Sequence, residues 1–393
     1  MANDVWDITK DLRIQYAKVV SGVTTWYDIT ADSYDVSIDR GILVEQQVFA
    51  RPDIGTARIS LEKSSLADFT VAPDYKSDMP FRIQYRPAPD TASGIWNNLF
   101  WGLIQNISMF YDVDAKKLKI TITANDLIKV LLNMQLPSFS ISTGSLGFRG
   151  AMNALATACN SVDSRAYFSQ AGTPGLGGAT IQWANSWVDT AVSEILNQFL
   201  DAELGWLWCE MGSSNLYLTR LDIDNLQATA WSTSRGTVSN IHSSSTLHYC
   251  MDHVELNYDS DQLVNDVKVT ETVSTPASDK KATNSTSTST YGVQTQEFSI
   301  TMNPGTSPYT AMSDWASAVV NAADPKQIRS VSCPALRRDG KTSNVVTHDI
   351  AYPLQVEFTD GTNTIQQTQL ITRIKHQISA DHWEVTLDLW RGI

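Results

Sequence analysis

The chain has 393 residues, of which 42% are hydrophobic and 18% charged, and this length is enough for two or three ordinary domains. Its net charge of −13 argues against wrapping nucleic acid, because neutralising phosphates requires clustered Lys and Arg. Residues 1–10 contain no apolar run, so we expect no signal peptide. The sequence contains no stretch of about 20 apolar residues, so we expect no membrane-spanning helix. Four scattered cysteines without a Cys-x-x-Cys motif are typical of reduced thiols in a protein made in the cytoplasm: Cys159, Cys209, Cys250 and Cys333.

The first third of the chain has the pattern of antiparallel strands. Apolar and polar residues alternate in residues 57–62 and again in residues 117–124. Each segment therefore has one face to bury and one to leave in water. The 12 Trp and 13 Tyr residues favour the same β-rich class, since strands favour aromatic side chains.

The middle of the chain combines helices with a hairpin. Residues 150–162 and 187–204 carry apolar residues at helical spacing, and Ser186 with Asp189 resembles an N-terminal cap of the second helix, which Gly205 would end. The glycine-rich residues 172–178 predict a loop. Two apolar segments, 205–209 and 215–219, flank a turn and predict a β-hairpin.

The last third returns to strands. Residues 274–290 are almost wholly polar, so we expect a mobile loop there. A helix is predicted over about 308–323, because Ser307 can cap it, Pro308 suits its first position and Asp324-Pro325 stops it. Its apolar stripe comprises Met312, Trp315, Ala316, Val319 and Val320. Residues 382–389 alternate and predict a final strand.

The two ends of the chain resemble each other. Four strand-like segments recur in the same order: 57–62 with 266–271, 80–85 with 353–358, 101–108 with 373–379, and 118–122 with 383–387. Short alternating runs also resemble one another by chance, but the shared order favours a duplicated small barrel or sandwich. Residues 136–231, between the copies, predict an α+β insert.

Motifs for chemistry are weak throughout. Gly340-Lys341-Thr342 lacks the glycine five residues earlier that a phosphate-binding loop needs, and no Gly-x-Ser-x-Gly or His-Glu-x-x-His occurs. One group could hold zinc on a strand, although its spacing matches no closed zinc pattern: His242, His248, Cys250, Asp252 and His253. The carboxylate pairs Asp222/Asp224 and Asp259/Asp261 are more typical of turns than of glycosidase acids. We therefore assign no catalytic, cofactor-binding or metal-ligating residue.

Several segments together resemble phage minor tail proteins, the tail-hub family of long-tailed phages. They cover nearly the whole chain in the family's order: 55–62, 100–104 and 120–127 at the start, 201–207 in the centre, 258–267 as the most distinctive match, and 376–387 at the end. The resemblance implies two tail-tube-like β-barrel domains, residues 1–135 and 236–393, around an α+β insert at 136–235. It also implies a homotrimer, in which three chains present six similar units to a six-fold tail tube.

The same resemblance implies a structural role in the virion. The ring would be assembled in the host cytoplasm and contact the tail tube or distal tail protein, the tape measure protein and other tail-tip proteins. DNA would pass through it without specific binding, and an acidic lumen would repel that DNA. Unlike many relatives, the sequence stops soon after its last predicted strand, so we expect no C-terminal receptor-binding or hydrolase extension.

Two other functions stay open at this point. A carbohydrate-binding tail-tip module is the first, since Trp-rich β-domains stack on sugars and Trp96, Trp101 and Trp231 are less clearly core residues than Trp315 and Trp383. A tail-associated cell-wall hydrolase is the second. We expect no enzyme and no cofactor.

Overall fold

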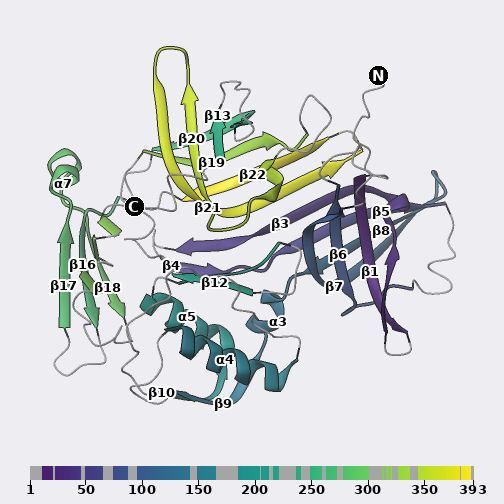
Figure 1. The fold of residues 1–393 in the computed structure, drawn as a ribbon, viewed down its shortest axis with the longest axis horizontal. Coiled ribbons are helices and arrows are strands. Elements are labelled where there is room, and N and C mark those ends of the chain that lie inside the picture. The colour runs from purple at the N-terminus through teal and green to yellow at the C-terminus, as the bar shows by residue number, and fades with distance from the viewer. Residues whose placement is uncertain are drawn as a thin grey trace.

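The computed structural model describes most of the chain (Figure 1). The described residues are 11–20, 23–45, 49–64, 74–86, 95–141, 148–164, 185–203, 205–211, 216–220, 236–239, 248–258, 263–271, 278–300, 312–313, 316–317, 319–320, 326–336, 344–380 and 382–390. The fold is mainly β, as the composition predicts. No helix among these residues is long and apolar enough to cross a bilayer.

Fifteen strands form the main sheet. They are β1 (Leu12–Val20), β2 (Val23–Asp28), β3 (Ser33–Glu45), β4 (Phe49–Pro52), β5 (Thr56–Lys63), β6 (Pro80–Tyr85), β7 (Asn97–Asp112), β8 (Lys117–Asn125), β13 (Gly236–Ser239), β14 (His248–Cys250), β15 (His253–Tyr258), β19 (Lys326–Pro334), β20 (Pro353–Thr359), β21 (Thr364–Ser379) and β22 (Trp383–Trp390). Short 3-10 turns lie at η1 (Thr30–Asp32) and η2 (Asn344–Thr347).

Two halves of this sheet have the same strand order. The first unit runs β3-β5-β8-β7-β6-β1-β2, and the second runs β15-β19-β22-β21-β20-β13-β14. The strands also follow one another along the chain in the same sequence in both units. One difference is that β13 pairs in parallel with both neighbours, whereas β1 pairs antiparallel with both of its own. The internal repeat predicted from the sequence is therefore present in the fold.

Local details of the two units coincide as well. Pro80 opens β6 opposite Leu103, and Pro353 opens β20 opposite Leu370. Just before each proline, Asp78 and Ala351 have positive φ angles of 66° and 63°. The N–H of each donates to the carbonyl of an isoleucine in the long strand, Ile104 at 2.7 Å and Ile371 at 2.8 Å.

A bulge recurs at the matching place. The register of β7 on β8 shifts between Ile104 and Asn106, and that of β21 on β22 shifts between Ile371 and Arg373. Bulges are specific features of a strand rather than random defects. Leu103 and Leu370, and with them residues 106–112 of β7 and 373–379 of β21, thus occupy equivalent positions.

The fold corrects two of the four sequence pairings. Residues 80–85 match 353–358, and 118–122 match 383–387, as predicted. The predicted partner of β5 was wrong: residues 266–271 lie in a separate small sheet, and the strand that occupies the place of β5 is β19. The third pair joins the correct strands, β7 and β21, but in the wrong register. Alternation identifies strands well and registers poorly, since every second residue looks alike.

Between β8 of the first unit and β13 of the second, the described residues form three helices and two strand pairs. They are α3 (Ile128–Leu132), β9 (Gln135–Ile141), α4 (Phe148–Val162), β10 (Asn185–Ala191), α5 (Val192–Glu203), β11 (Gly205–Cys209) and β12 (Leu216–Arg220). The predicted helix at 150–162 and the β11–β12 hairpin are confirmed. Figure 1 shows α4 and α5 below the main sheet, with β9 and β10 beneath them.

The predicted helix at 187–204 was half wrong. Residues 185–191 form β10, which pairs with β9, and α5 begins only at Val192. Trp187 stacks on Phe139 across that pair with ring centroids 5.5 Å apart, so aromatic packing outweighs the helical spacing. Asp189 has a positive φ of 48° in the strand and does not cap the helix.

The polar run at 274–290 is largely folded, contrary to the sequence prediction. A separate sheet contains β16 (Asp266–Glu271), β17 (Ser278–Thr283) and β18 (Thr295–Ile300). The helix α7 (Ser285–Tyr291) lies between β17 and β18 along the chain. Asn284 caps α7, since its side chain accepts from the N–H of Ser287. The buried apolar residues of this sheet lie in the two strands beside the polar run, Val267 and Val269 in β16 and Phe298 in β18. A polar strand can therefore fold on an apolar neighbour.

The other predicted elements agree where the structure describes them. Residues 57–62, 117–124 and 383–389 lie in β5, β8 and β22 with the expected alternate burial. Within 308–323, residues 312–313, 316–317 and 319–320 are helical, and Met312, Ala316, Val319 and Val320 are buried. Trp315 and the loop at 172–178 lie outside the described residues.

Candidate assembly surface

The two units are joined inside the chain by one pair of strands. Residues 373–379 of β21 pair antiparallel with residues 35–41 of β3. Ile374, His376 and Ile378 lie on the core side, opposite Arg40, Ile38 and Val36, and all six side chains are buried. We call this pairing the internal joint; it makes the sheet continuous from the second unit into the first, as Figure 1 shows.

Polar contacts close the other face of the internal joint. The Arg373 guanidinium pairs with the carboxylates of Asp39 and, at 3.0 Å, Asp53. Further along, the Gln377 amide donates to Asp35 at 3.1 Å. The joint therefore has an apolar face and a hydrogen-bonded face, as a strand pair inside a sheet should.

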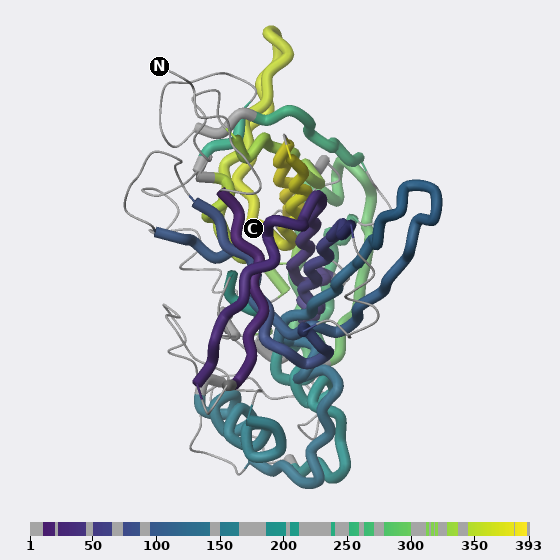
Figure 2. The backbone as a smooth tube through the Cα atoms, turned by 90° about the vertical axis from the view of Figure 1, so that its right-hand side faces the viewer, coloured from purple at the N-terminus to yellow at the C-terminus, as the bar shows by residue number. Residues whose placement is uncertain are grey.

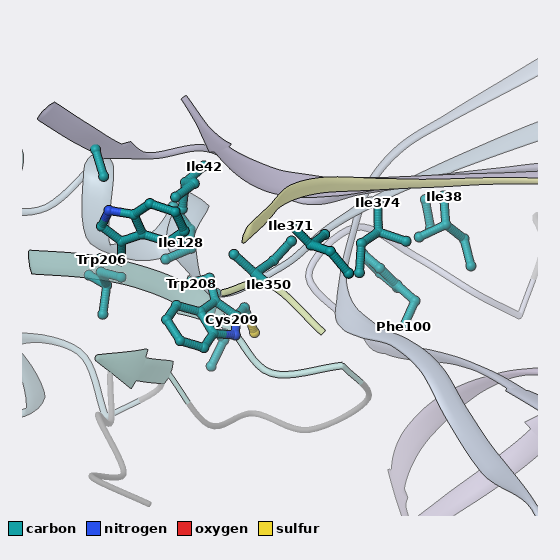
Figure 3. Close-up of a cluster of buried hydrophobic side chains, with 14 of the residues drawn as sticks. Ile38, Ile42, Phe100, Ile128, Trp206, Trp208, Cys209, Ile350, Ile371 and Ile374 are labelled. Atoms are coloured by element: carbon teal, nitrogen blue, oxygen red, sulfur yellow. The ribbon is translucent and has the colours of Figure 1, made fainter. Parts of the chain in front are cut away.

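Arg40 connects the joint to the insert. One of its Nη atoms donates to the Cys209 carbonyl at 3.1 Å, and the other lies 2.9 Å from the Asp349 carboxylate. The second oxygen of Asp349 accepts from the N–H of Met211 at 3.2 Å. A buried cation thus holds together β3, the end of β11 and the segment after η2. Figure 3 shows buried apolar side chains of this region, with Cys209 and Ile350 between Trp208 and two isoleucines of β21, Ile371 and Ile374.

Two ionisable groups near Arg40 have strongly shifted pKa values. Burial raises the pKa of Asp126 to about 7, although the N–H of Gly55 and of Ile128, and the charge of Arg40, oppose the rise. Burial lowers the pKa of His376 to about 3, and the charge of Arg40 acts in the same direction. The indole N–H of Trp383 donates to Nδ1 of His376 at 3.3 Å, so this histidine is packed as a neutral ring.

Half of β7 has an unoccupied edge. Residues 97–103 pair with β6 and residues 103–112 pair with β8, so beyond the end of β6 one edge of residues 106–112 has no strand beside it in the described part of the chain. Figure 2 shows the blue β7–β8 hairpin projecting from the body. Phe110, in this overhang, is 64% exposed. Free edges of this kind pair readily with other chains.

A second unoccupied edge belongs to β15. This strand pairs with β19 alone among the strands that the structure describes. Leu256 and Tyr258 on it are 51% and 61% exposed. Large apolar side chains along an unpaired edge mark a surface that another molecule covers.

The residues weighed for chemistry do not form a site in the described part of the chain. Asp252 and His253 are exposed at the start of β15; the side chains of His248 and Cys250 are not described, and His242 lies outside the described residues. The described residues contain no group of His, Cys, Asp and Glu that could hold a metal. Asp222/Asp224, Asp259/Asp261, Gly340-Lys341-Thr342 and Trp231 also lie outside.

Two half-buried tryptophans, Trp26 and Trp96, are covered by cations. The Arg13 guanidinium lies 4.1 Å from the ring centre of Trp96, and that of Arg86 lies 5.0 Å away. Arg82 lies 4.0 Å over Trp26 in the same way. A ring face that stacks on a guanidinium is not free to stack on a sugar. Trp101 packs against the core, and Trp383 is fully buried, as its position on an apolar stripe predicted.

Sequence reasoning missed the features that define this surface. The burial of Arg40 and Asp126 has no local signal, since each stands in an ordinary alternating or turn segment. The overhang of β7 could have been found, because its 16 residues exceed the 6 of β6 beside it.

Solved structures of phage tail proteins have this fold. A tail protein from Neisseria meningitidis MC58 superimposes with a TM-score of 0.62 at 9% identity, over 97% of this chain and 96% of that one. The 43 kDa tail protein of prophage MuSo2 from Shewanella oneidensis gives 0.57 at 12% identity, over 97% and 98%. Prophage tail protein gp18 from Listeria monocytogenes EGD-e gives 0.54 at 12% identity, over 96% and 94%.

These similarities extend over nearly the full length of each chain. No family model and no curated protein matches the sequence. The chain thus shares its mainly β fold with these tail proteins. It is similar to tail proteins of about its own length, as the sequence resemblance implied.

Proposed function

We propose that this chain is a structural subunit of a phage tail tip, in which three copies form a hub ring. The fold supports a tail component, and the observation that carries the ring is the repeated strand order of the two units. Three chains with two like units each present six similar surfaces. Such a ring can meet a tube of six-fold symmetry, which one unit per chain could not do with three chains.

The two units also suggest the division of the chain. We propose residues 1–135 and 236–393 as the ring-forming parts and residues 136–235 as the insert that flanks them. The internal joint supports this division, since it is where the second unit continues into the first.

The wet face of the sheet would line the channel. The opposite face of β3, β5, β7 and β8 packs on the core, so closing the sheet into a ring leaves the wet face toward the lumen. Several charges on that face occur in pairs: Lys117 with Glu62, Lys119 with Asp112, and Lys375 with Asp388. Ser and Thr fill many of the other positions. We therefore replace the acidic lumen expected from net charge with a nearly neutral, hydroxyl-rich one, which also holds DNA weakly.

In this role the partners are the tail tube or distal tail protein above, the tape measure protein within and other tip proteins below. DNA would pass through without specific contacts, and the subunit would act without catalysis. The covered rings of Trp26 and Trp96 favour this role over sugar binding.

The test is the mass of the purified full chain in solution, with negative-stain images. A three-chain particle with a central hole supports the proposal. A monomer at every concentration, or specific saturable binding to cell-wall glycans together with a monomeric state, contradicts it.

A further inference from the structure

We propose that residues 106–112 of β7 pair with β15 of a second copy of this chain, antiparallel, with Met109 opposite Leu256. This inference rests on the proposed ring and identifies the strands that close it. Its basis is that the chain already contains one such contact, the internal joint, and that both of its strands have equivalents whose edges are unoccupied.

The first equivalent is β7. Residues 373–379 of β21 extend past the end of β20 and pair there with β3. Because Leu103 corresponds to Leu370, the overhang of β7 at 106–112 corresponds to 373–379. It extends past the end of β6 in the same way, but nothing in the described part of the chain pairs with it.

The second equivalent is β15. Both β3 and β15 stand at the start of the spatial strand order of their unit. Each pairs antiparallel with the next strand in that order. Following matched partners through β22 and β19, as through β8 and β5, aligns Val254 with Val36. The register of β15 on β19 shifts between Glu255 and Leu256, because β19 has one extra residue there. β15 itself has no extra residue, so counting along it from Val254 makes Leu256 correspond to Ile38 and Tyr258 to Arg40.

Exposure shows what each edge lacks. In the internal joint Ile38 is 1% exposed, whereas its equivalent Leu256 is 51% exposed. On the other strand Ile374, His376 and Ile378 are buried, and their equivalents Ile107, Met109 and Tyr111 are only partly buried against the core. In both strands an apolar side chain is less buried than its equivalent in the internal joint, which the partner strand covers.

The register follows from the internal joint. There His376 lies opposite Ile38, and Ile378 opposite Val36. Substituting the equivalents places Met109 opposite Leu256 and Tyr111 opposite Val254. On the wet face Phe110 then lies opposite Glu255, where its exposed ring packs across the new strand pair.

The pairing generates a closed ring. Each chain offers one β7 overhang and one β15 edge, so copies join head to tail. The sheet then continues through β15-β19-β22-β21-β3-β5-β8-β7 and into β15 of the next copy. Both kinds of contact in the ring, within and between chains, would have the same geometry.

A disulfide tests the register. In the double variant Met109→Cys/Leu256→Cys, the two cysteines would lie directly opposite each other. Their Cα atoms would be about 5 Å apart, a distance that a disulfide can bridge. Mild oxidation of the full chain should give covalent dimers and trimers on a non-reducing gel. The matched control Phe110→Cys/Leu256→Cys places the two thiols on opposite faces of the sheet, so it should stay monomeric on the same gel.

The single variants Met109→Cys and Leu256→Cys show whether the native cysteines link, and they should give no ladder. Cys159, Cys209 and Cys333 are buried, which favours that result. A ladder in the double variant alone supports the pairing.

The outcomes separate this inference from the proposed function. If the full chain forms a three-chain particle but the double variant does not cross-link, the ring stands and this pairing is overturned. If Phe110→Cys/Leu256→Cys forms covalent dimers and trimers to the same extent as Met109→Cys/Leu256→Cys, the proposed register is wrong. If the chain is monomeric and does not cross-link, both proposals fail.

Discussion

The Arg40 guanidinium lies 2.9 Å from the Asp349 carboxylate, and its side chain is only 3% exposed. These two residues are far apart in sequence, in β3 and after η2. Their contact fixes the first unit, the second unit and the insert at one point, because Arg40 also donates to the Cys209 carbonyl.

Replacing Arg40 should therefore destabilise the whole chain. Arg40→Ala removes the cation that pairs with Asp349 and the side-chain donor to the Cys209 carbonyl, and removing one partner of a buried ion pair typically costs about 3–5 kcal/mol. Denaturant unfolding should show this loss in the free energy of unfolding. Arg58→Ala, an exposed arginine on β5, is the control and should change it by less than about 0.5 kcal/mol. Equal effects in the two variants would contradict the role of Arg40.

Gly55 should tolerate no side chain. A Cβ at this position would lie 2.4 Å from Oδ2 of Asp126 and 3.3 Å from Cγ of Arg40, and both neighbours are held by buried contacts. We expect Gly55→Ala to cost about 1–3 kcal/mol, as overpacking does. At Gly292 a Cβ meets nothing within 4 Å, but φ of 79° with ψ of 173° is a conformation that only glycine readily adopts, so Gly292→Ala should cost about 1–3 kcal/mol from backbone strain alone. Thermal unfolding measures both losses; an unchanged melting temperature in Gly55→Ala would show that Asp126 can move away.

Stability should rise with pH between about 4 and 6.5. The pKa of His376 falls to about 3 and that of His348 to about 4, below the ordinary 6.5, so in this window the unfolded chain binds more protons at these sites. The pKa of Asp126, raised to about 7 from 3.8, acts in the opposite direction, because the folded chain retains that proton. Two groups outweigh one, and each proton contributes about 1.4 kcal/mol per pH unit.

His376→Gln tests this balance. With one histidine removed, His348 and Asp126 nearly cancel, so the variant should lose the rise seen in the parent chain between pH 4 and 6.5. Denaturant midpoints measured across that range compare the two slopes. Parallel slopes would show that His376 is protonated in the folded chain.

The fold class could be predicted because burial acts on alternate residues. Leu118, Ile120 and Ile122 lie on one face of β8 as their spacing requires, and the same holds for Val385 and Leu387 on β22. The repeat was visible for the same reason. The registers of the repeated strands could not be predicted, because a pattern with a period of two looks the same after a shift of two residues. The features that mark the equivalent positions are the positive φ angles of Asp78 and Ala351.

The assembly surface could not be predicted in the same way. Met109 and His376 are equivalent in the fold but share no side-chain chemistry, and their difference in burial depends on whether β3 lies beside them. That depends on contacts between residues more than 300 apart in sequence, as in the pairing of Arg373 with Asp39. Local patterns carry no information about such contacts.

Asn265 should be essential for the small sheet. It is fully buried, donates to the carbonyl of Gly292 at 2.8 Å and accepts from the N–H of Gln294 at 2.8 Å, so it ties β16 to the end of α7. Asn265→Ala leaves these groups unpaired, at about 1–3 kcal/mol. Hydrogen exchange should speed up over residues 278–300 more than in β8. The exposed Thr286→Ala is the control, and equal exchange in both variants would contradict this role.

A charge on the β15 edge should weaken assembly without harming the fold. Leu256 is half exposed in the single chain, so Leu256→Lys should leave its melting temperature within a few degrees of the parent, while a lysine facing Met109 of the next copy would lose apolar contact and be desolvated. We expect the apparent dissociation constant of the three-chain particle to rise at least tenfold by sedimentation. Val188→Lys on β10 is the matched control, since Val188 is 68% exposed and lies in the separate two-stranded sheet of β9 and β10, which contains neither free edge. It should assemble like the parent, because no strand of another copy covers it. Dissociation caused equally by both lysines would mean that general charge, rather than the β15 edge, governs assembly.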